Sequence, residues 1–284
     1  MLVQPASVLN RIADDAAYQA TYPKMIGRGG PATHELHTFL ADINPSESSL
    51  KKYYQAVDDW NAQHPGLQDK MKACFLALIF RGENGEEKTV KVMQSARYYR
   101  CDDTDEVVRQ MHADADYFAS QGLSVIREKI EATAYGIDGI PQTDEEARAY
   151  PKYFEFHIKI GQGDRQLDNT PLSEQQVEEL KKISRQFSQQ FGTPIPLSFN
   201  CNPDGVTGDG QGYQRFLNVR FRQQGINSIA PRLAKVTEAI TKAGLRVMKT
   251  ISEYVWYDSF TALDKGWIDF DEVEVSAAAV GAQP

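Results

Sequence analysis

Two short segments of the sequence place a carboxylate and an imidazole two residues apart. They read Glu35-Leu36-His37 and Glu155-Phe156-His157. Residues i and i+2 of a β-strand project from the same face, so each segment, as a strand, presents its glutamate and histidine together. Such a pair can exchange protons with a substrate or contribute ligands to a metal ion. Glu35, His37, Glu155 and His157 are therefore the candidate catalytic residues.

A second pair of matching segments lies at nearly the same spacing. Residues 122–127 (Gly-Leu-Ser-Val-Ile-Arg) match residues 244–249 (Gly-Leu-Arg-Val-Met-Lys), and at this offset Glu131 falls on Glu253. Two matches in the same order at nearly one offset indicate an internal duplication.

Apolar periodicity gives the same order of elements in both copies. Phe154, Phe156 and Ile158 alternate with polar residues, which is typical of a strand buried on one face. Ser173 to Gln176 has the pattern of a capping box, and the apolar stripe that follows closes at Gly192. The predicted strands, separated by helices, are 34–40, 73–80, 89–98 and 124–134, then 153–160, 194–202, 213–222 and 246–257. Two prolines suggest an edge position for strand 194–202.

Strand–helix–strand–strand–helix–strand is the ferredoxin-like arrangement. The sequence therefore predicts an α+β protein, an α/β sandwich of two tandem ferredoxin-like repeats related by pseudo-two-fold symmetry. Two such sheets in one chain can also face each other, as in dimeric α+β barrels. The expected units are an N-terminal extension (1–30), repeat 1 (31–137), a linker (138–150), repeat 2 (151–258) and a C-terminal extension with a tail (259–284).

The sheet face that points away from the helices collects polar residues. Besides the glutamates and histidines, the predicted ligand-binding residues on it are Lys129, Lys159, Asn218, Arg220 and Lys249. The register of strand 89–98 is open, so either Lys91, Met93, Ser95 and Arg97 or Val90, Val92 and Gln94 join this face. A plain alternative is that water solvates this face, or that cross-strand ion pairs neutralise its charges.

Three functional hypotheses follow from this face. In the first, a divalent metal such as zinc, manganese or iron is the cofactor. Its ligands would be Glu35, His37 and Glu131 in the first copy, and Glu155, His157 and Glu253 in the second. In the second hypothesis, the cleft between the lobes binds a small, anionic molecule, with or without catalysis. The third is a non-catalytic protein-interaction module.

His37 and His157, one in each copy, also resemble the paired histidines of the two-histidine phosphoesterases and RNA cyclic phosphodiesterases. That resemblance implies hydrolysis of a phosphate ester, with one imidazole as base and the other as acid, and with Lys129, Lys159 and Arg220 holding the phosphate. The family motif carries a hydroxyl residue two positions after each histidine. Here those positions are Phe39 and Lys159.

The order of the motifs resembles a family of two-repeat proteins that has no established activity. The similarity spans most of residues 31–270 and rests on the two Glu-apolar-His strands, on Tyr257-Asp258 and on the run from Leu263 to Ile268 (Leu-Asp-Lys-Gly-Trp-Ile). It implies the tandem architecture and no particular reaction.

The net charge and composition narrow the possible classes of protein further. The net charge of −8 argues against general nucleic-acid binding, and no apolar run is long enough to span a membrane. The first 22 residues lack the pattern of a signal peptide, and the three cysteines are widely spaced. We therefore expect a soluble, cytoplasmic protein with reduced thiols, and the composition is compatible with a homo-oligomer.

Overall fold

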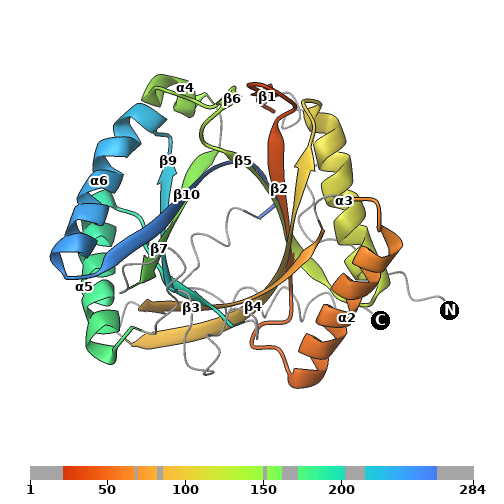
Figure 1. The fold of residues 1–284 in the computed structure, drawn as a ribbon, viewed down its shortest axis with the longest axis horizontal. Coiled ribbons are helices and arrows are strands. Elements are labelled where there is room, and N and C mark those ends of the chain that lie inside the picture. Colours follow the sequence, from red (N-terminus) through yellow and green to blue (C-terminus); the bar gives the residue numbers. More distant parts are fainter. Residues whose placement is uncertain are drawn as a thin grey trace.

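The computed structural model describes residues 22–67, 70–81, 86–149, 152–161, 172–201 and 215–260. Within these ranges, the strands form one closed eight-stranded barrel and a separate two-stranded ribbon (Figure 1). The barrel strands are β2 (Thr33–Leu40), β3 (Lys72–Arg81), β4 (Glu87–Arg100), β5 (Val125–Thr133), β7 (Tyr153–Gly161), β8 (Leu197–Asn200), β9 (Arg215–Arg222) and β10 (Arg246–Asp258). The ribbon pairs β1 (Ile26–Gly27) with β6 (Ile137–Asp138).

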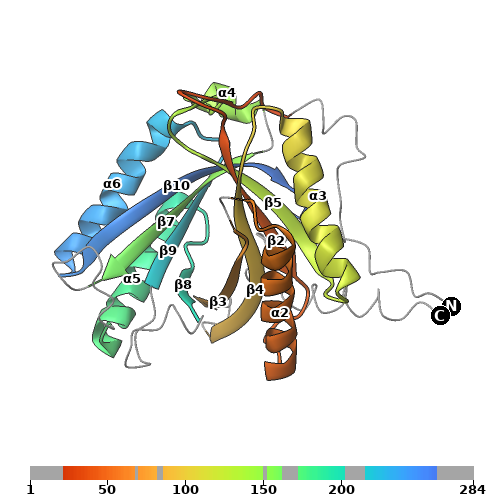
Figure 2. The same cartoon turned by 45° about the vertical axis from the view of Figure 1, so that its right-hand side comes forward.

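Helices cover the outside of the barrel. They are α2 (Glu47–Gln63), α3 (Thr104–Ser120), α4 (Asp144–Arg148), α5 (Glu174–Phe191) and α6 (Ile226–Lys242). The pair α2 and α3 lies on one side and the pair α5 and α6 on the opposite side, as both views show (Figures 1 and 2). None of the helices in the described ranges is long and apolar enough to cross a membrane.

The predicted α/β sandwich of two separate sheets is wrong. The strand order is β10-β5-β2-β4-β3-β8-β9-β7, and β7 pairs with β10 to close the barrel. Antiparallel pairing of β10 with β5, and of β3 with β8, joins the two halves of the chain. In two separate sheets these four strands would be edges with unpaired backbone groups, and closure removes those edges.

The predicted edge position of the strand near residue 197 is also wrong. β8 lies between β3 and β9 and forms hydrogen-bonded pairs with both. Pro194 and Pro196 precede Leu197, the first residue of the strand, so their missing N–H groups do not interrupt either ladder.

Local sequence explains why the helices sit on the outer face. Phe154, Phe156 and Ile158 of β7 are fully buried, and they belong to the same apolar cluster as Leu180 and Phe187 of α5. Burying one such side chain contributes about 1.5–3 kcal/mol. Helix α5 begins with the predicted capping box at Ser173 and ends at Gly192, whose φ of 65° is left-handed.

The order strand–helix–strand–strand–helix–strand occurs twice along the chain, from β2 to β5 and from β7 to β10. The two Glu-apolar-His segments occupy the first strand of each half, β2 and β7. The run from Leu263 to Ile268 lies outside the described residues. Because the apolar faces of all these strands pack against the helices, the alternate side chains point into the barrel.

Candidate functional site

The interior of the barrel holds a cavity of about 370 Å³ that contains most of the predicted site residues. In β2, Leu36 packs into the outer core, while Glu35, His37 and Phe39 line the cavity. One wall of the cavity is mainly apolar and is called the apolar wall below; it consists of Cys74, Leu76, Leu78, Val92, Ala96 and Phe216. A cavity of this size can hold a small molecule.

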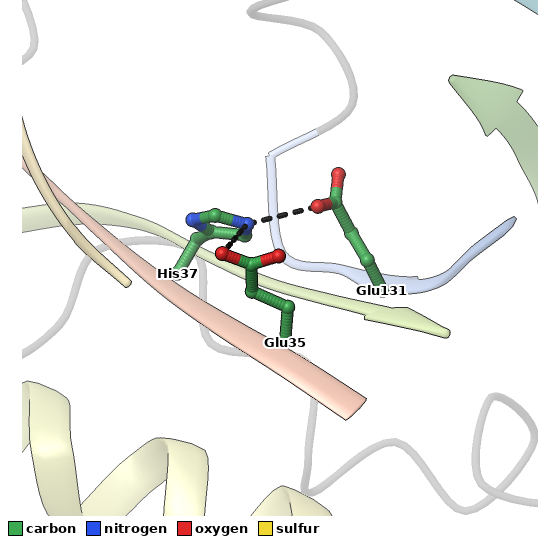
Figure 3. Close-up of side chains that lie close together, drawn as sticks. All are labelled: Glu35, His37 and Glu131. Atoms are coloured by element: carbon green, nitrogen blue, oxygen red, sulfur yellow. Dashed lines mark hydrogen bonds and ion pairs between the residues drawn. The ribbon is translucent and has the colours of Figure 1, made fainter. Parts of the chain in front are cut away.

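Glu35, His37 and Glu131 converge in the first half of the barrel (Figure 3). Glu35 and Glu131 are cross-strand partners on β2 and β5. The Nε2 atom of His37 lies 2.8 Å from Oε2 of Glu131 and 4.0 Å from Oε1 of Glu35. Gln94 donates from its Nε2 atom to Nδ1 of His37 at 3.3 Å, so Nε2 carries the proton that His37 donates to Glu131. Burial opposes protonation, yet the Glu131 carboxylate raises the pKa of His37 above its usual value.

The second half repeats this arrangement with different partners. His157 donates from Nδ1 to Oδ1 of Asn218 at 2.6 Å, and Asn218 donates from Nδ2 to the Ser198 hydroxyl at 2.8 Å. This chain fixes the ring and directs Nε2 at Glu253, 3.2 Å away. Burial opposes protonation, but the hydrogen bond to Glu253 and the nearby carboxylates raise the pKa of His157 to about 9. Burial and the charge of Glu131 raise the pKa of Glu253 to about 7.

Glu155 pairs with two cations inside the barrel, one of which it shares with Glu131. Arg220 donates from Nη2 to Oε1 of Glu155 at 2.7 Å, and Lys129 donates from Nζ to Oε2 at 3.0 Å. The Lys129 ammonium also lies 2.5 Å from Oε1 of Glu131. Burial opposes ionisation of Glu155, but these two cations hold its pKa well below the usual range. Lys129 and Arg220, which the sequence suggested for ligand binding, thus pair with carboxylates of the protein itself.

Two groups of side chains in the described ranges have the geometry to hold a metal ion. They are Glu35, His37 and Glu131, and Glu131, His157 and Glu253; within each group the candidate ligand atoms lie within 4.8 Å of one another. The first is the predicted ligand set. In the second, Glu131 from the first half takes the place predicted for Glu155. Glu131 is common to both groups, so the two halves contribute to one cluster.

Sequence reasoning missed Tyr98 of this cluster and gave Gln94 only as one of two register alternatives. Both line the cavity from β4, together with Val92, which resolves the register that the sequence left open. Tyr98 forms a side-chain hydrogen bond with Glu35, and its pKa is raised by burial and by that carboxylate. The sequence gave little indication that Tyr98 lines the cavity, because both faces of β4 carry a mixture of polar and apolar residues.

Lys159 and Lys249 lie at one end of the interior face. They are cross-strand partners on β7 and β10, two residues beyond the pair formed by His157 and Ile251. Lys249 lines a second cavity of about 350 Å³, which shares Glu35, Glu131 and Glu253 with the first. This second cavity connects the cluster to the end of the barrel where the lysines lie.

The fold and the site together define an α+β barrel protein with a cluster of carboxylates and imidazoles in an interior cavity. No family model matches the chain, and no curated protein matches it either.

Solved structures with some likeness include a proposed monooxygenase from Lactobacillus acidophilus NCFM, at 11% identity, 80% coverage of this chain, 94% of the other and a TM-score of 0.26. A heme-binding protein from Thermus thermophilus has 10% identity, 82% and 94% coverage and a TM-score of 0.25. A dye-decolorizing protein from V. cholerae has 10% identity, 80% and 95% coverage and a TM-score of 0.24. Likenesses this low carry no argument about function.

Proposed function

We propose that the protein binds one divalent transition-metal ion at the Glu131 cluster and uses it to act on a small molecule held in the barrel. The observation that carries the proposal is that two groups of candidate ligands, one with His37 and one with His157, share the buried carboxylate of Glu131. Mixed histidine and glutamate ligands suit zinc, manganese or iron.

The charges of the cluster favour a cation. Glu35, Glu131, Glu155 and Glu253 face two buried cations, Lys129 and Arg220. The raised pKa values of His37 and His157 mean that protons on the imidazoles offset part of this charge in the metal-free protein. A metal ion binds neutral histidines, and once both are deprotonated the excess of two negative charges is neutralised by one divalent ion.

The hydrogen bonds of the cluster support one position for the ion. In the metal-free protein a proton lies between Nε2 of His37 and Oε2 of Glu131, 2.8 Å apart. A metal ion would replace that proton, because both atoms are good ligands once the imidazole is neutral. Glu155 stays outside the proposed ligand set because both of its oxygens pair with cations, Oε1 with Arg220 and Oε2 with Lys129. Glu131 pairs with Lys129 through Oε1 and keeps Oε2 beside Nε2 of His37.

The apolar wall supports a reaction on an organic molecule rather than storage of an ion. It faces the cluster across the same cavity, so a ligand can bury an apolar body there and present a polar group to the metal. A bound divalent ion can polarise a substrate oxygen or lower the pKa of a bound water molecule.

The phosphoesterase hypothesis has less support. Its two histidines do line one cavity, but two of its three predicted phosphate-binding cations, Lys129 and Arg220, form ion pairs with Glu155. A phosphate next to His37 and His157 would also meet an excess of carboxylates.

Metal titration of the purified, chelator-treated protein tests the proposal. Wild-type protein should bind one equivalent of Zn²⁺ or Mn²⁺ by calorimetry and gain thermal stability. Glu131→Gln should lose most of this binding, because both candidate ligand groups contain Glu131. The matched control is Glu128→Gln, since Glu128 is equally buried on β5 but contacts His112 of α3 outside the barrel.

The control variant should bind the metal as wild type does. No uptake by wild-type protein, or equal uptake by both variants, would rule out this site.

A further inference from the structure

Lys159 and Lys249 form a pair of like charges at one end of the interior face of the barrel, where Lys159 is half-buried and Lys249 is exposed. Their backbone positions are directly opposite in the β7–β10 ladder, so both side chains project from the same side of the sheet. Within the described part of the chain, neither ammonium has a carboxylate partner. Cross-strand lysines are mutually destabilising, and an anion between them would remove that cost.

The pair lies on the route to the cluster. Lys249 lines the cavity that also contains Glu35, Glu131 and Glu253. Lys159 lies two residues along β7 from His157, and Lys249 lies four residues along β10 from Glu253. At about 3.3 Å per residue, the lysine positions are roughly 7 to 13 Å from the cluster.

The interior is thus divided by charge. Its centre is acidic, one wall is apolar, and one end carries two unneutralised cations. An anion cannot bind favourably at the centre, but it can bind at the lysines while the rest of the molecule extends inward.

We propose that Lys159 and Lys249 bind the acidic group, a carboxylate or a phosphate, of a small substrate whose other end reaches the cluster roughly 7 to 13 Å further in. The substrate is then an elongated acid, with an apolar middle that fits the apolar wall. The anion site stands without a metal; only the role of the inner end rests on the proposed function.

Binding of inorganic phosphate and of succinate to chelator-treated protein tests the anion site. The double variant Lys159→Met/Lys249→Met should bind both probes at least about tenfold more weakly than wild type, because each lysine contributes a charge-assisted hydrogen bond. The control is Lys182→Met/Lys235→Met, which changes the net charge equally at two exposed helix positions. Phosphate binding without succinate binding, or the reverse, would identify the acidic group.

A third measurement places the anion relative to the cluster. In Mn²⁺-loaded protein, the paramagnetic relaxation of the phosphorus nucleus should give a distance within the range of roughly 7 to 13 Å. Direct coordination of phosphate by Mn²⁺ would overturn the proposal, and so would equal binding by the two double variants or no binding by wild type. Failure of Mn²⁺ to bind, with the lysine effect intact, would refute the metal site and leave the anion site standing.

The variants also separate binding from folding. The Lys159→Met/Lys249→Met protein should be at least as stable as wild type without ligand, since the change removes like-charge repulsion. Reduced stability together with lost binding would show that the lysines support the fold, and would overturn the assignment.

Discussion

One buried ion pair spans the seam at which the two halves of the chain meet. Asp258, the last residue of β10, is the register partner of Lys129 on β5. Arg127 of β5 donates to Asp258 from Nε at 2.9 Å and from Nη2 at 2.5 Å, and the Tyr153 hydroxyl donates to Asp258 at 2.8 Å. Only 2% of the Arg127 side chain and 3% of the Asp258 side chain are exposed. The pair therefore exists only if β5 and β10 lie side by side, which a closed barrel requires.

Removing one partner of this pair should be costly. Asp258→Asn leaves a buried guanidinium without a counter-charge, and such changes cost about 3–5 kcal/mol. Arg127 keeps its hydrogen bond to Tyr153, so we expect the lower end, about 3 kcal/mol. Arg127→Met should cost a similar amount. The double variant should be less destabilised than the sum of the two, with a coupling energy of about 2 kcal/mol or more.

Urea unfolding followed by circular dichroism measures these free energies. The control is the exposed pair Glu238 and Lys242 on α6, at 2.6 Å, where Glu238→Gln and Lys242→Met should show much weaker coupling. If the coupling between Arg127 and Asp258 were below about 0.5 kcal/mol, the two side chains would not be a buried pair. The pairing of β5 with β10, and with it the closed barrel, would then be refuted.

Three further predictions concern other parts of the molecule. Burial lowers the pKa of Lys152 to about 7, so the unfolded state binds more protons between pH 7 and 10.5 and stability rises with pH there. Lys152→Met should remove this rise, as much as about 3 kcal/mol, in unfolding curves at pH 7 and 10. Glu155→Gln should lower the free energy of unfolding in urea by about 3 kcal/mol or more, because it leaves two buried cations without their carboxylate partner. An unchanged free energy of unfolding would contradict these ion pairs. Gly139→Ala should lower stability by at least about 1 kcal/mol more than Gly29→Ala. Both glycines have positive φ, but only at Gly139 would a Cβ collide with the Lys24 carbonyl. Equal losses of stability in the two variants would count against that packing.

Much of the local structure could be predicted from short-range patterns. The alternation in 153–160 located β7, and Ser173 with Gly192 located both ends of α5. Such signals are readable because the period of the apolar residues and the capping hydrogen bonds involve neighbours in sequence. The same alternation predicted that Glu35 and His37 would project away from the helices, into what is now the cavity.

The composition of the site depended on contacts between distant strands. Glu155 and Glu35 are equivalent in the two copies of the sequence, yet only Glu35 belongs to a candidate ligand group, and Glu131 belongs to both groups. Glu155 is contacted by Arg220 from β9 as well as by Lys129 from β5, and Lys129 also contacts Glu131. No local pattern specifies which carboxylate a cation from another strand will contact.

The sequence by itself determined which segments are strands and helices, and which face of each strand is polar. The tertiary structure decided that β5 pairs with β10 and β3 with β8, across the two halves of the chain. The polar faces therefore enclose one cavity and do not form two solvated surfaces. The physical reason is that side-chain alternation is set within a strand, whereas pairing between β5 and β10, or between β3 and β8, is set by unpaired backbone groups far apart in the chain.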